Sequence, residues 1–112
     1  MPRRFSRLAM TAFLAGNLLL PAAAQQPNNF DGRVFEAVSN RGIENLEVKL
    51  TPPTNSDLPV RLAGTDQMGQ FHFAQVRQGR YLIEVSQGPS LLYRAEIDTG
   101  RQNHIDIPLQ RR

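Results

Sequence analysis

Apolar and polar residues alternate one by one along most of the chain after Gln25, and this period of two constrains the fold more than any other feature. Leu46, Val48 and Leu50 alternate with Glu47 and Lys49. The same alternation recurs at Val34, at Val60 and Leu62, at Phe71 and Phe73, at Tyr81, Ile83 and Val85, and at Ile105, Ile107 and Leu109. Successive side chains of a strand point to opposite faces, so each run predicts a strand with one face on a core and the other in water.

Turn-forming residues separate these runs, at 39–42, 52–57, 78–79, 87–90 and 99–100. Glycine and asparagine tolerate a positive φ, and proline fixes a bend. No amphipathic helical window of ten or more residues follows Gln25. Short strands spaced about 8–12 residues apart predict an all-β sandwich or barrel. Pro108 cannot donate a ladder hydrogen bond, so the last strand is expected either to lie at a sheet edge or to end at this residue.

The first 24 residues have the three parts of a secretory signal peptide. Arg3, Arg4 and Arg7 give a positive start, and 8–20 is an apolar run of 13 residues. Ala22 and Ala24 frame a small-residue cleavage site. We therefore expect an exported protein, periplasmic or secreted, with a flexible lead-in at 25–29 and one domain at 30–110.

Composition supports a small folded domain and excludes several classes of function. Residues 25–112 include 23 Ile, Leu, Val and Phe among 88, above the range of disordered chains. The full chain carries a formal charge of +3, but residues 25–112 hold ten basic and ten acidic residues. This balance excludes a basic footprint for nucleic acid. The absence of cysteine excludes disulfides and thiol catalysis. No stretch of the chain approaches the roughly 20 apolar residues that a membrane-spanning helix needs, so none is expected in the mature chain.

Between Gly32 and Val85 the residues resemble the carboxypeptidase regulatory-like domain, a transthyretin-like (prealbumin-like) sandwich. Gly32-Arg33-Val34 resembles its opening strand, and 43–50 resembles its second strand. The most specific piece is 65–85, which resembles the pattern T-D-x-x-G-x-F-x-F followed by L-x-x-G-x-Y-x-L-x-V; it carries Thr65, Asp66, Gly69, Phe71, Phe73, Gly79 and Tyr81. The resemblance implies a single antiparallel Greek-key β-sandwich of about seven strands, closed by strands at 91–98 and 102–109.

The chain departs from that family pattern at two positions. Gly42 stands where the family usually has proline, and Asn45 stands where it usually has glycine. Asparagine tolerates the left-handed region better than most residues, so the bend is expected to survive. Read from the residues alone, Asp66 accepts backbone N–H bonds to close a turn, Gly69 takes a positive φ, and Tyr81 buries its ring.

Few residues are suited to catalysis. His72 and His104 are the only histidines, and by alternation His72 points away from the face of Phe71 and Phe73. A metal site would need both histidines to converge with carboxylates such as Asp106, and no short ligand spacing is present. A small hydrolase would need one of the histidines beside an aspartate and a hydroxyl. We predict no cofactor, no metal and no enzymatic activity.

Since no enzymatic activity is predicted, we expect a binding function, for which there are two alternatives. A non-catalytic module that contacts another envelope or secreted protein would use the unpaired backbone groups of its edge strands. A carbohydrate-binding module would use exposed aromatic rings, for which Phe35 and Tyr93 are the candidates. In sandwiches of similar fold a lysine can cross-link to an asparagine; Lys49, the only lysine, is expected on the outer face and unsuited to this.

Overall fold

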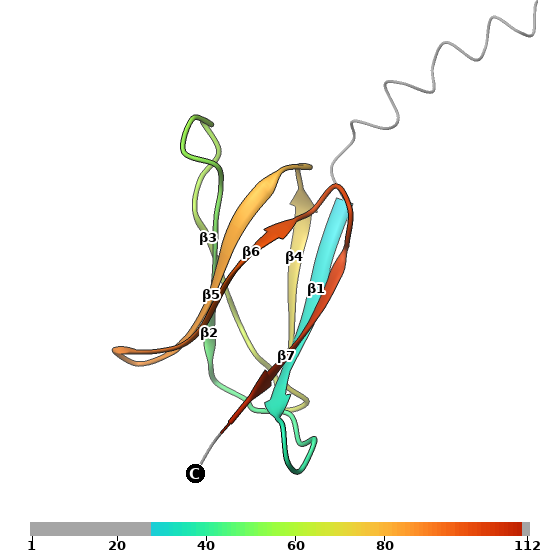
Figure 1. Ribbon diagram of the computed structural model, residues 1–112, viewed down its shortest axis with the longest axis vertical. Helices are drawn as coiled ribbons and strands as arrows, with labels where there is room; N and C mark the ends of the chain where they lie inside the picture. The colour runs from blue at the N-terminus through green and yellow to red at the C-terminus, as the bar shows by residue number, and fades with distance from the viewer. Residues whose placement is uncertain (1–27, 111–112) are drawn as a thin grey trace, which may run out of the picture.

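A computed structural model of the chain describes residues 28–110. The predicted signal peptide and residues 25–27 of the lead-in lie outside the described residues. Within them the chain forms seven strands and no helix (Figure 1), which confirms the all-β sandwich. The strands are β1 (Asn28–Glu36), β2 (Glu47–Thr51), β3 (Arg61–Gly64), β4 (Gln70–Val76), β5 (Arg80–Gln87), β6 (Ser90–Asp98) and β7 (His104–Leu109).

The strands form two facing sheets. The three-stranded sheet has the order β4-β1-β7, and the four-stranded sheet has the order β3-β2-β5-β6. All pairs are antiparallel except β1 and β7, which run parallel from Asp31 opposite His104 to Glu36 opposite Leu109. The expectation of a purely antiparallel sandwich is corrected at this pair. The connection from β6 to β7 crosses between the sheets, so β7 arrives beside β1 in the same direction.

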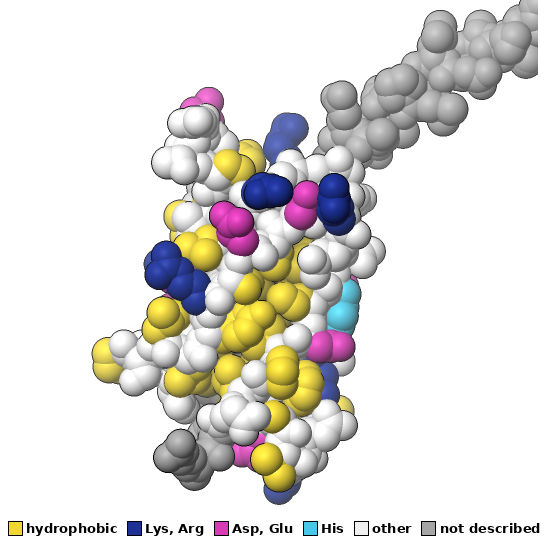
Figure 2. Space-filling model, in the orientation of Figure 1, with side chains coloured by type: hydrophobic (Ala, Val, Ile, Leu, Met, Phe, Trp, Pro, Cys, Tyr) yellow, Lys and Arg dark blue, Asp and Glu magenta, His cyan; other side chains and the backbone are white. Residues whose placement is uncertain are grey.

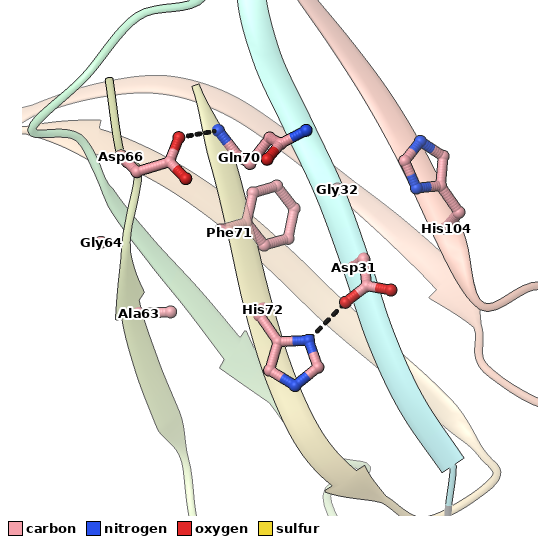
Figure 3. Close-up of a pocket in the computed structure, with 9 residues that line it drawn as sticks. All are labelled: Asp31, Gly32, Ala63, Gly64, Asp66, Gln70, Phe71, His72 and His104. Carbon is pink, nitrogen blue, oxygen red and sulfur yellow. Dashed lines mark hydrogen bonds and ion pairs between the residues drawn. The ribbon is translucent and has the colours of Figure 1, made fainter. Parts of the chain in front are cut away.

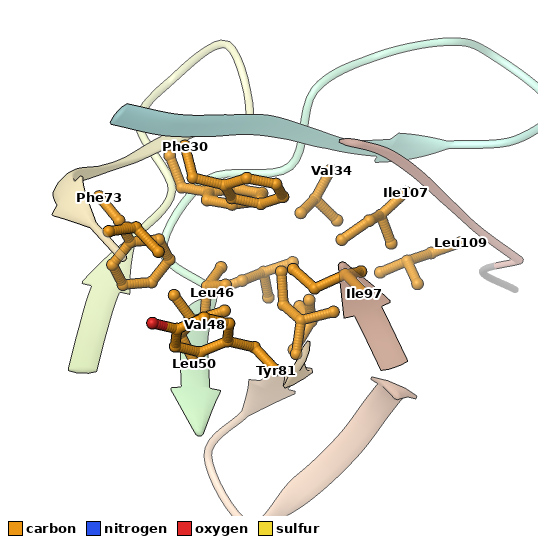
Figure 4. Close-up of a cluster of buried hydrophobic side chains, with 14 residues drawn as sticks. Phe30, Val34, Leu46, Val48, Leu50, Phe73, Tyr81, Ile97, Ile107 and Leu109 are labelled. Carbon is orange, nitrogen blue, oxygen red and sulfur yellow. The ribbon is translucent and has the colours of Figure 1, made fainter. Parts of the chain in front are cut away.

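The core lies between the two sheets and contains the residues that the alternation places inward (Figure 4). Phe71 and Phe73 pack edge to face, with ring centroids 6.0 Å apart. Burial of such side chains is the main favourable contribution to folding. The buried apolar residues are Phe30, Val34, Leu46, Val48, Leu50, Phe71, Phe73, Val76, Tyr81, Ile83, Val85, Ile97, Ile107 and Leu109.

The expected orientation of the third strand is wrong. Val60 and Leu62 face solvent, and Leu62 is 59% exposed. Leu62 lies opposite Lys49 of β2, so the two side chains share the outer face of the sheet. The inward positions of β3 are Arg61, whose guanidinium lies 5.7 Å from the Phe73 ring centroid, and Ala63.

Both ends of the fold differ slightly from expectation. β1 begins at Asn28, inside the expected lead-in, because Asn28 pairs with Val76 and the Asn29 side chain accepts the Gln75 N–H at 3.2 Å. β7 begins at His104 rather than Gln102, and it lies at a sheet edge, as Pro108 predicts. Among residues 28–110, no helix has the length and apolarity needed to cross a bilayer.

A tight turn carries the chain from β3 in one sheet to β4 in the other. The Asp66 carboxylate accepts the N–H groups of Met68 and Gln70, both at 2.9 Å. Gly69 has a φ of +79°, and a Cβ on it would lie 2.1 Å from the Val34 carbonyl oxygen. The Val34 N–H donates to the Gly69 carbonyl at 2.8 Å, so the turn is held against β1 at a distance that only glycine permits.

Replacing Gly69 with alanine should therefore destabilise the fold in two ways. The positive φ costs about 1–2 kcal/mol for an L-residue, and the collision with the Val34 carbonyl adds about 1–3 kcal/mol. Gly88→Ala is the matched control, because Gly88 also has a positive φ, of +57°, but its Cβ would meet nothing within 4 Å. Urea unfolding should show Gly69→Ala to be the less stable variant by a clear margin; equal losses would contradict the close approach.

Candidate functional site

The two sheets leave a gap between β3 and β4 on one side of the sandwich. β3 pairs only with β2 and β4 pairs only with β1, so each strand has one edge without a neighbour in its sheet. The two strands lie alongside each other across this gap. We call it the β3–β4 gap.

A hollow lies at the end of the β3–β4 gap nearest the Asp66 turn (Figure 3). It has a volume of about 750 Å³. Its walls come from four parts of the chain: Ala63, Gly64 and Asp66 on the β3 side, Gln70, Phe71 and His72 on β4, Asp31 and Gly32 on β1, and His104 on β7. A Cβ on Gly32 would lie 2.2 Å from the Phe71 ring, so this glycine makes room for the ring.

Both histidines lie beside carboxylates on the outer face of the three-stranded sheet. Asp31 is opposite His72 on β4 and opposite His104 on β7, so the three form one row across the sheet. The His72 Nδ1 contacts the Asp31 Oδ1, as Figure 3 shows, and the His104 Nε2 lies 2.8 Å from the Asp106 Oδ1. The side chains of His72 and His104 are 55% and 53% exposed.

A histidine–aspartate pair can accept or donate a proton, but the lining of the hollow offers no hydroxyl, thiol or amine for it to activate. The lining residues include no serine, threonine, cysteine or lysine. The hydrolase arrangement considered from the sequence needs a hydroxyl nucleophile within hydrogen-bond reach of the base. The hydrolase arrangement of histidine, aspartate and hydroxyl is therefore not brought together at this hollow.

The structure also separates the candidate metal ligands. His72 bonds to Asp31 and His104 bonds to Asp106, two pairs rather than one converging set. Across residues 28–110, no group of three or more histidines and acidic residues is arranged to hold a metal ion. Asp66, whose carboxylate accepts two backbone N–H groups, acts as a turn residue.

A second hollow, of about 260 Å³, lies at the other end of the β3–β4 gap. Its lining includes Arg61 and Pro59 from the β3 side, Gln75 from β4, Arg77 from the β4–β5 turn and Tyr81 from β5. The Arg61 guanidinium donates to the Gln75 carbonyl at 3.4 Å and so crosses the β3–β4 gap at the second hollow. Gln75 has a φ of +55°, in the left-handed region that glutamine rarely adopts, and it lies in a bulge of β4.

Tyr81 borders this second hollow from the core. Its hydroxyl donates to the Arg77 carbonyl at 2.9 Å. Burial raises the pKa of Tyr81 above its ordinary value of 10.0, and the charges of Arg61 and Arg77 act in the opposite direction. The end of the gap that carries Tyr81 is thus lined by two cations, whereas the other end carries Asp31 and Asp66.

The other motif residues hold the loops around the gap. The Thr65 hydroxyl accepts the Leu46 N–H at 2.9 Å, and the Gly79 N–H donates to the Thr99 hydroxyl at 3.0 Å. Asn45 has a φ of +66°, so this asparagine does take the conformation for which the resembled family usually has glycine.

Phe35 and Tyr93 are not brought together. Phe35 lies on the outer face of the three-stranded sheet, with the Arg33 guanidinium 4.8 Å from its ring centroid. Tyr93 lies on β6 of the other sheet, opposite Val85, and packs partly against the core. The aromatic platform that a carbohydrate site would need from these two rings is therefore absent.

Lys49 lies on the outer face of the four-stranded sheet. Its Nζ is 3.6 Å from a carboxylate oxygen of Glu84. A lysine must lose its proton to act as a nucleophile, which burial favours, whereas the Lys49 side chain is 46% exposed. This location agrees with the expected one and does not suit a cross-linking reaction.

Sequence reasoning missed Asp31, Arg61 and Gln75. Asp31 and His72 lie 41 residues apart, and only the register of β1 against β4 brings them together. The alternation predicts an outward Arg61 between two inward apolar neighbours, the reverse of what the structure has. Arg61 lies in a strand of only four residues, with Pro59 just before it. These two features were the available signal that the alternation is a weak guide to orientation at this strand.

Comparisons with known proteins support the fold. No protein-family model matches the chain, and no curated protein matches its sequence. Similar solved structures include the major pilin subunit of Bacillus cereus (TM-score 0.60, 10% identity, 76% of this chain and 30% of that one). A second is fervidolysin from Fervidobacterium pennivorans, a keratinolytic enzyme related to subtilisin (TM-score 0.57, 15% identity, 76% and 16%). A third is a DUF3823 family protein from Parabacteroides merdae (TM-score 0.55, 12% identity, 77% and 46%).

These structures share a fold with the chain, and their identities of 10–15% show nothing further. The chain spans less than half the length of each of the three proteins. The comparison therefore supports a β-sandwich fold for the chain.

Tyr81→Phe tests the environment at the second hollow. Loss of the hydrogen bond to the Arg77 carbonyl should cost about 1 kcal/mol at neutral pH.

The raised pKa of Tyr81 means that folding favours the neutral phenol. The stabilisation that the neutral Tyr81 hydroxyl gives to the folded state is present below about pH 10. It is lost as the pH rises through the raised pKa of Tyr81. Urea unfolding at about pH 8 and about pH 11 should show the wild type losing its advantage over Tyr81→Phe at the higher pH. Tyr93→Phe controls for tyrosine titration elsewhere; an advantage unchanged by pH would contradict the assignment.

Proposed function

We propose that the chain is an exported, non-catalytic β-sandwich module that binds another protein of the cell envelope or exterior. The observation that supports this most is the β3–β4 gap, where two hollows lie end to end along unpaired strand edges. The similarity of the first 24 residues to a secretory signal supports export. The resemblance to the carboxypeptidase regulatory-like domain supports an accessory rather than a catalytic role.

The dimensions of the gap suit an extended polypeptide segment. β4 has seven residues, which correspond to about 23 Å of extended chain at about 3.3 Å per residue. A segment of about six residues would therefore reach from one hollow to the other. Over Arg61–Gly64 it would meet the free edge of β3, where backbone groups can pair with an added strand.

The charges along the gap give the segment a direction. Asp31 and Asp66 border the first hollow, and Arg61 and Arg77 border the second. A segment with a basic residue at one end and an acidic residue or a free carboxylate at the other would complement both. Such complementarity fixes orientation and register more than it adds affinity.

Gly64→Arg tests this role, because Gly64 is exposed and lines the first hollow. A Cβ there would meet only the Leu46 carbonyl oxygen, at 3.9 Å, so the fold should tolerate the new side chain, which starts on the outer face of β3 and is long enough to cover the mouth of the first hollow. Gln87→Arg adds the same charge at the exposed end of β5 and is the matched control. Chemical crosslinking in an envelope extract, followed by affinity recovery, should enrich one partner with the wild type and Gln87→Arg, and at least about tenfold less with Gly64→Arg.

Two results would contradict the proposal. One is recovery of the protein only as an uncrosslinked species, with no partner above the background of untagged extract. The other is equal recovery of the partner by Gly64→Arg and the wild type, since binding would then not use the β3–β4 gap.

A further inference from the structure

The four edge strands are not equally protected against pairing with another chain. β3 has only four residues, β4 has a bulge at Gln75, and β7 contains Pro108. Short strands, bulges and prolines are the devices that blunt a sheet edge. β6 has nine residues and no proline, and its only irregularity is the extra residue Leu92 opposite the Val85–Ser86 step. The stretch from Tyr93 to Asp98 is therefore a regular, open edge.

Apolar side chains accompany this edge. Tyr93 and Ala95 point toward the core and are only partly covered, and Leu91 is 53% exposed. Figure 2 shows apolar side chains gathered along the middle of the face on which Figure 1 places β6 and β7. A strand added beside β6 would cover part of this surface, and burial of apolar area would favour its addition.

We propose that β6 pairs with β6 of a second copy of the chain, antiparallel and centred on Ala95. In this register Arg94 of each copy lies directly opposite Glu96 of the other, on the outer face of the sheet. Tyr93 lies opposite Ile97 on the inner face. Opposite charges placed directly across an antiparallel pair stabilise it, and like charges destabilise it.

The neighbouring registers are disfavoured by the same charges. If the two-fold axis passed through residue 94, Arg94 would face Arg94 of the second copy. If it passed through residue 96, Glu96 would face Glu96. Both of these registers keep the inner and outer faces aligned, and the like charges that they bring together disfavour them relative to the register centred on Ala95. The charges along β6 therefore favour one symmetric, isologous pairing over its neighbouring registers.

Ion pairs within the four-stranded sheet already include the two charged residues of this pairing, Arg94 and Glu96. Glu84 lies between Lys49 at 3.6 Å and Arg94 at 3.8 Å, with its side chain only 15% exposed. Glu96 has a looser contact within its own sheet, 4.0 Å from Arg80, and both of these side chains are largely exposed. Pairing would extend the alternation from Lys49, Glu84 and Arg94 to Glu96 of the second copy.

The pairing would also set the shape of the dimer. The two four-stranded sheets would join edge to edge into one continuous sheet, with β3 of each copy at its two outer edges. The β3–β4 gaps would then lie at the two far ends, so a dimer would present both gaps to partners.

The test is the association state of the purified protein by sedimentation velocity over a concentration series. The wild type should form dimers at about 10–100 µM, the range of a weak interface. Glu96→Arg should weaken the dimer at least about tenfold, because the introduced guanidinium of each copy would then lie opposite Arg94 of the other. Glu47→Arg makes the same charge change on the outer face of β2, away from the edge, and should leave the dimer unchanged.

Charge exchange distinguishes this pairing from any other dimer. Arg94→Glu alone should also dissociate the dimer, and an equimolar mixture of Arg94→Glu with Glu96→Arg should form a heterodimer. The double variant Arg94→Glu/Glu96→Arg should dimerise again. Thermal unfolding of each variant checks that it is folded, since the carboxylate introduced by Arg94→Glu would face Glu84.

A wild type that stays monomeric throughout the series would overturn the proposal. So would a dimer that survives Glu96→Arg, or folded single variants that fail to form the heterodimer. Gly64→Arg should leave the dimer intact, so failure of this proposal and failure of the β3–β4 gap as a binding site are separate results.

Discussion

The close packing of the Asp66–Gly69 turn against β1 is the constraint on which the rest of the molecule depends. A Cβ on Gly69 would collide with the Val34 carbonyl, and one on Gly42 would lie 2.0 Å from the Met68 carbonyl oxygen. Because this turn is the connection from β3 to β4, its position decides where the edge of one sheet meets the edge of the other. The hollows, the Arg61 bridge and the polar ends of the β3–β4 gap all follow from that junction.

The two open sides of the sandwich differ in the chemistry they present. The β3–β4 side is hollowed and polar, with aspartates at one end and arginines at the other. The β6 side is a regular strand edge with alternating charge and partly covered apolar residues. Hollows suit the side chains of a docked segment, whereas a regular edge suits a continuous ladder of backbone hydrogen bonds. A small sandwich can therefore use both sides at once.

The alternation predicted the strands well where both faces had a clear preference, as at Val48 and Leu50 or at Phe71 and Phe73. It was wrong at Leu62, because a four-residue edge strand buries too little for the apolar pattern to decide its orientation. The turn at Asp66 and Gly69 follows from local chemistry and was accessible from the residues. The Asp31–His72 contact, the Arg61 bridge and the parallel pairing of β1 with β7 depend on register between distant segments, which local patterns do not carry.

The parallel arrangement of β1 and β7 also has a mechanical consequence. Asn28 and Leu109 lie at opposite ends of the three-stranded sheet, and six residue pairs join the two strands between them. A force that pulls those ends apart acts along the ladder, so its hydrogen bonds must break together rather than one after another. A sandwich connected in this way would resist stretching better than one whose terminal strands could be peeled open from a single end.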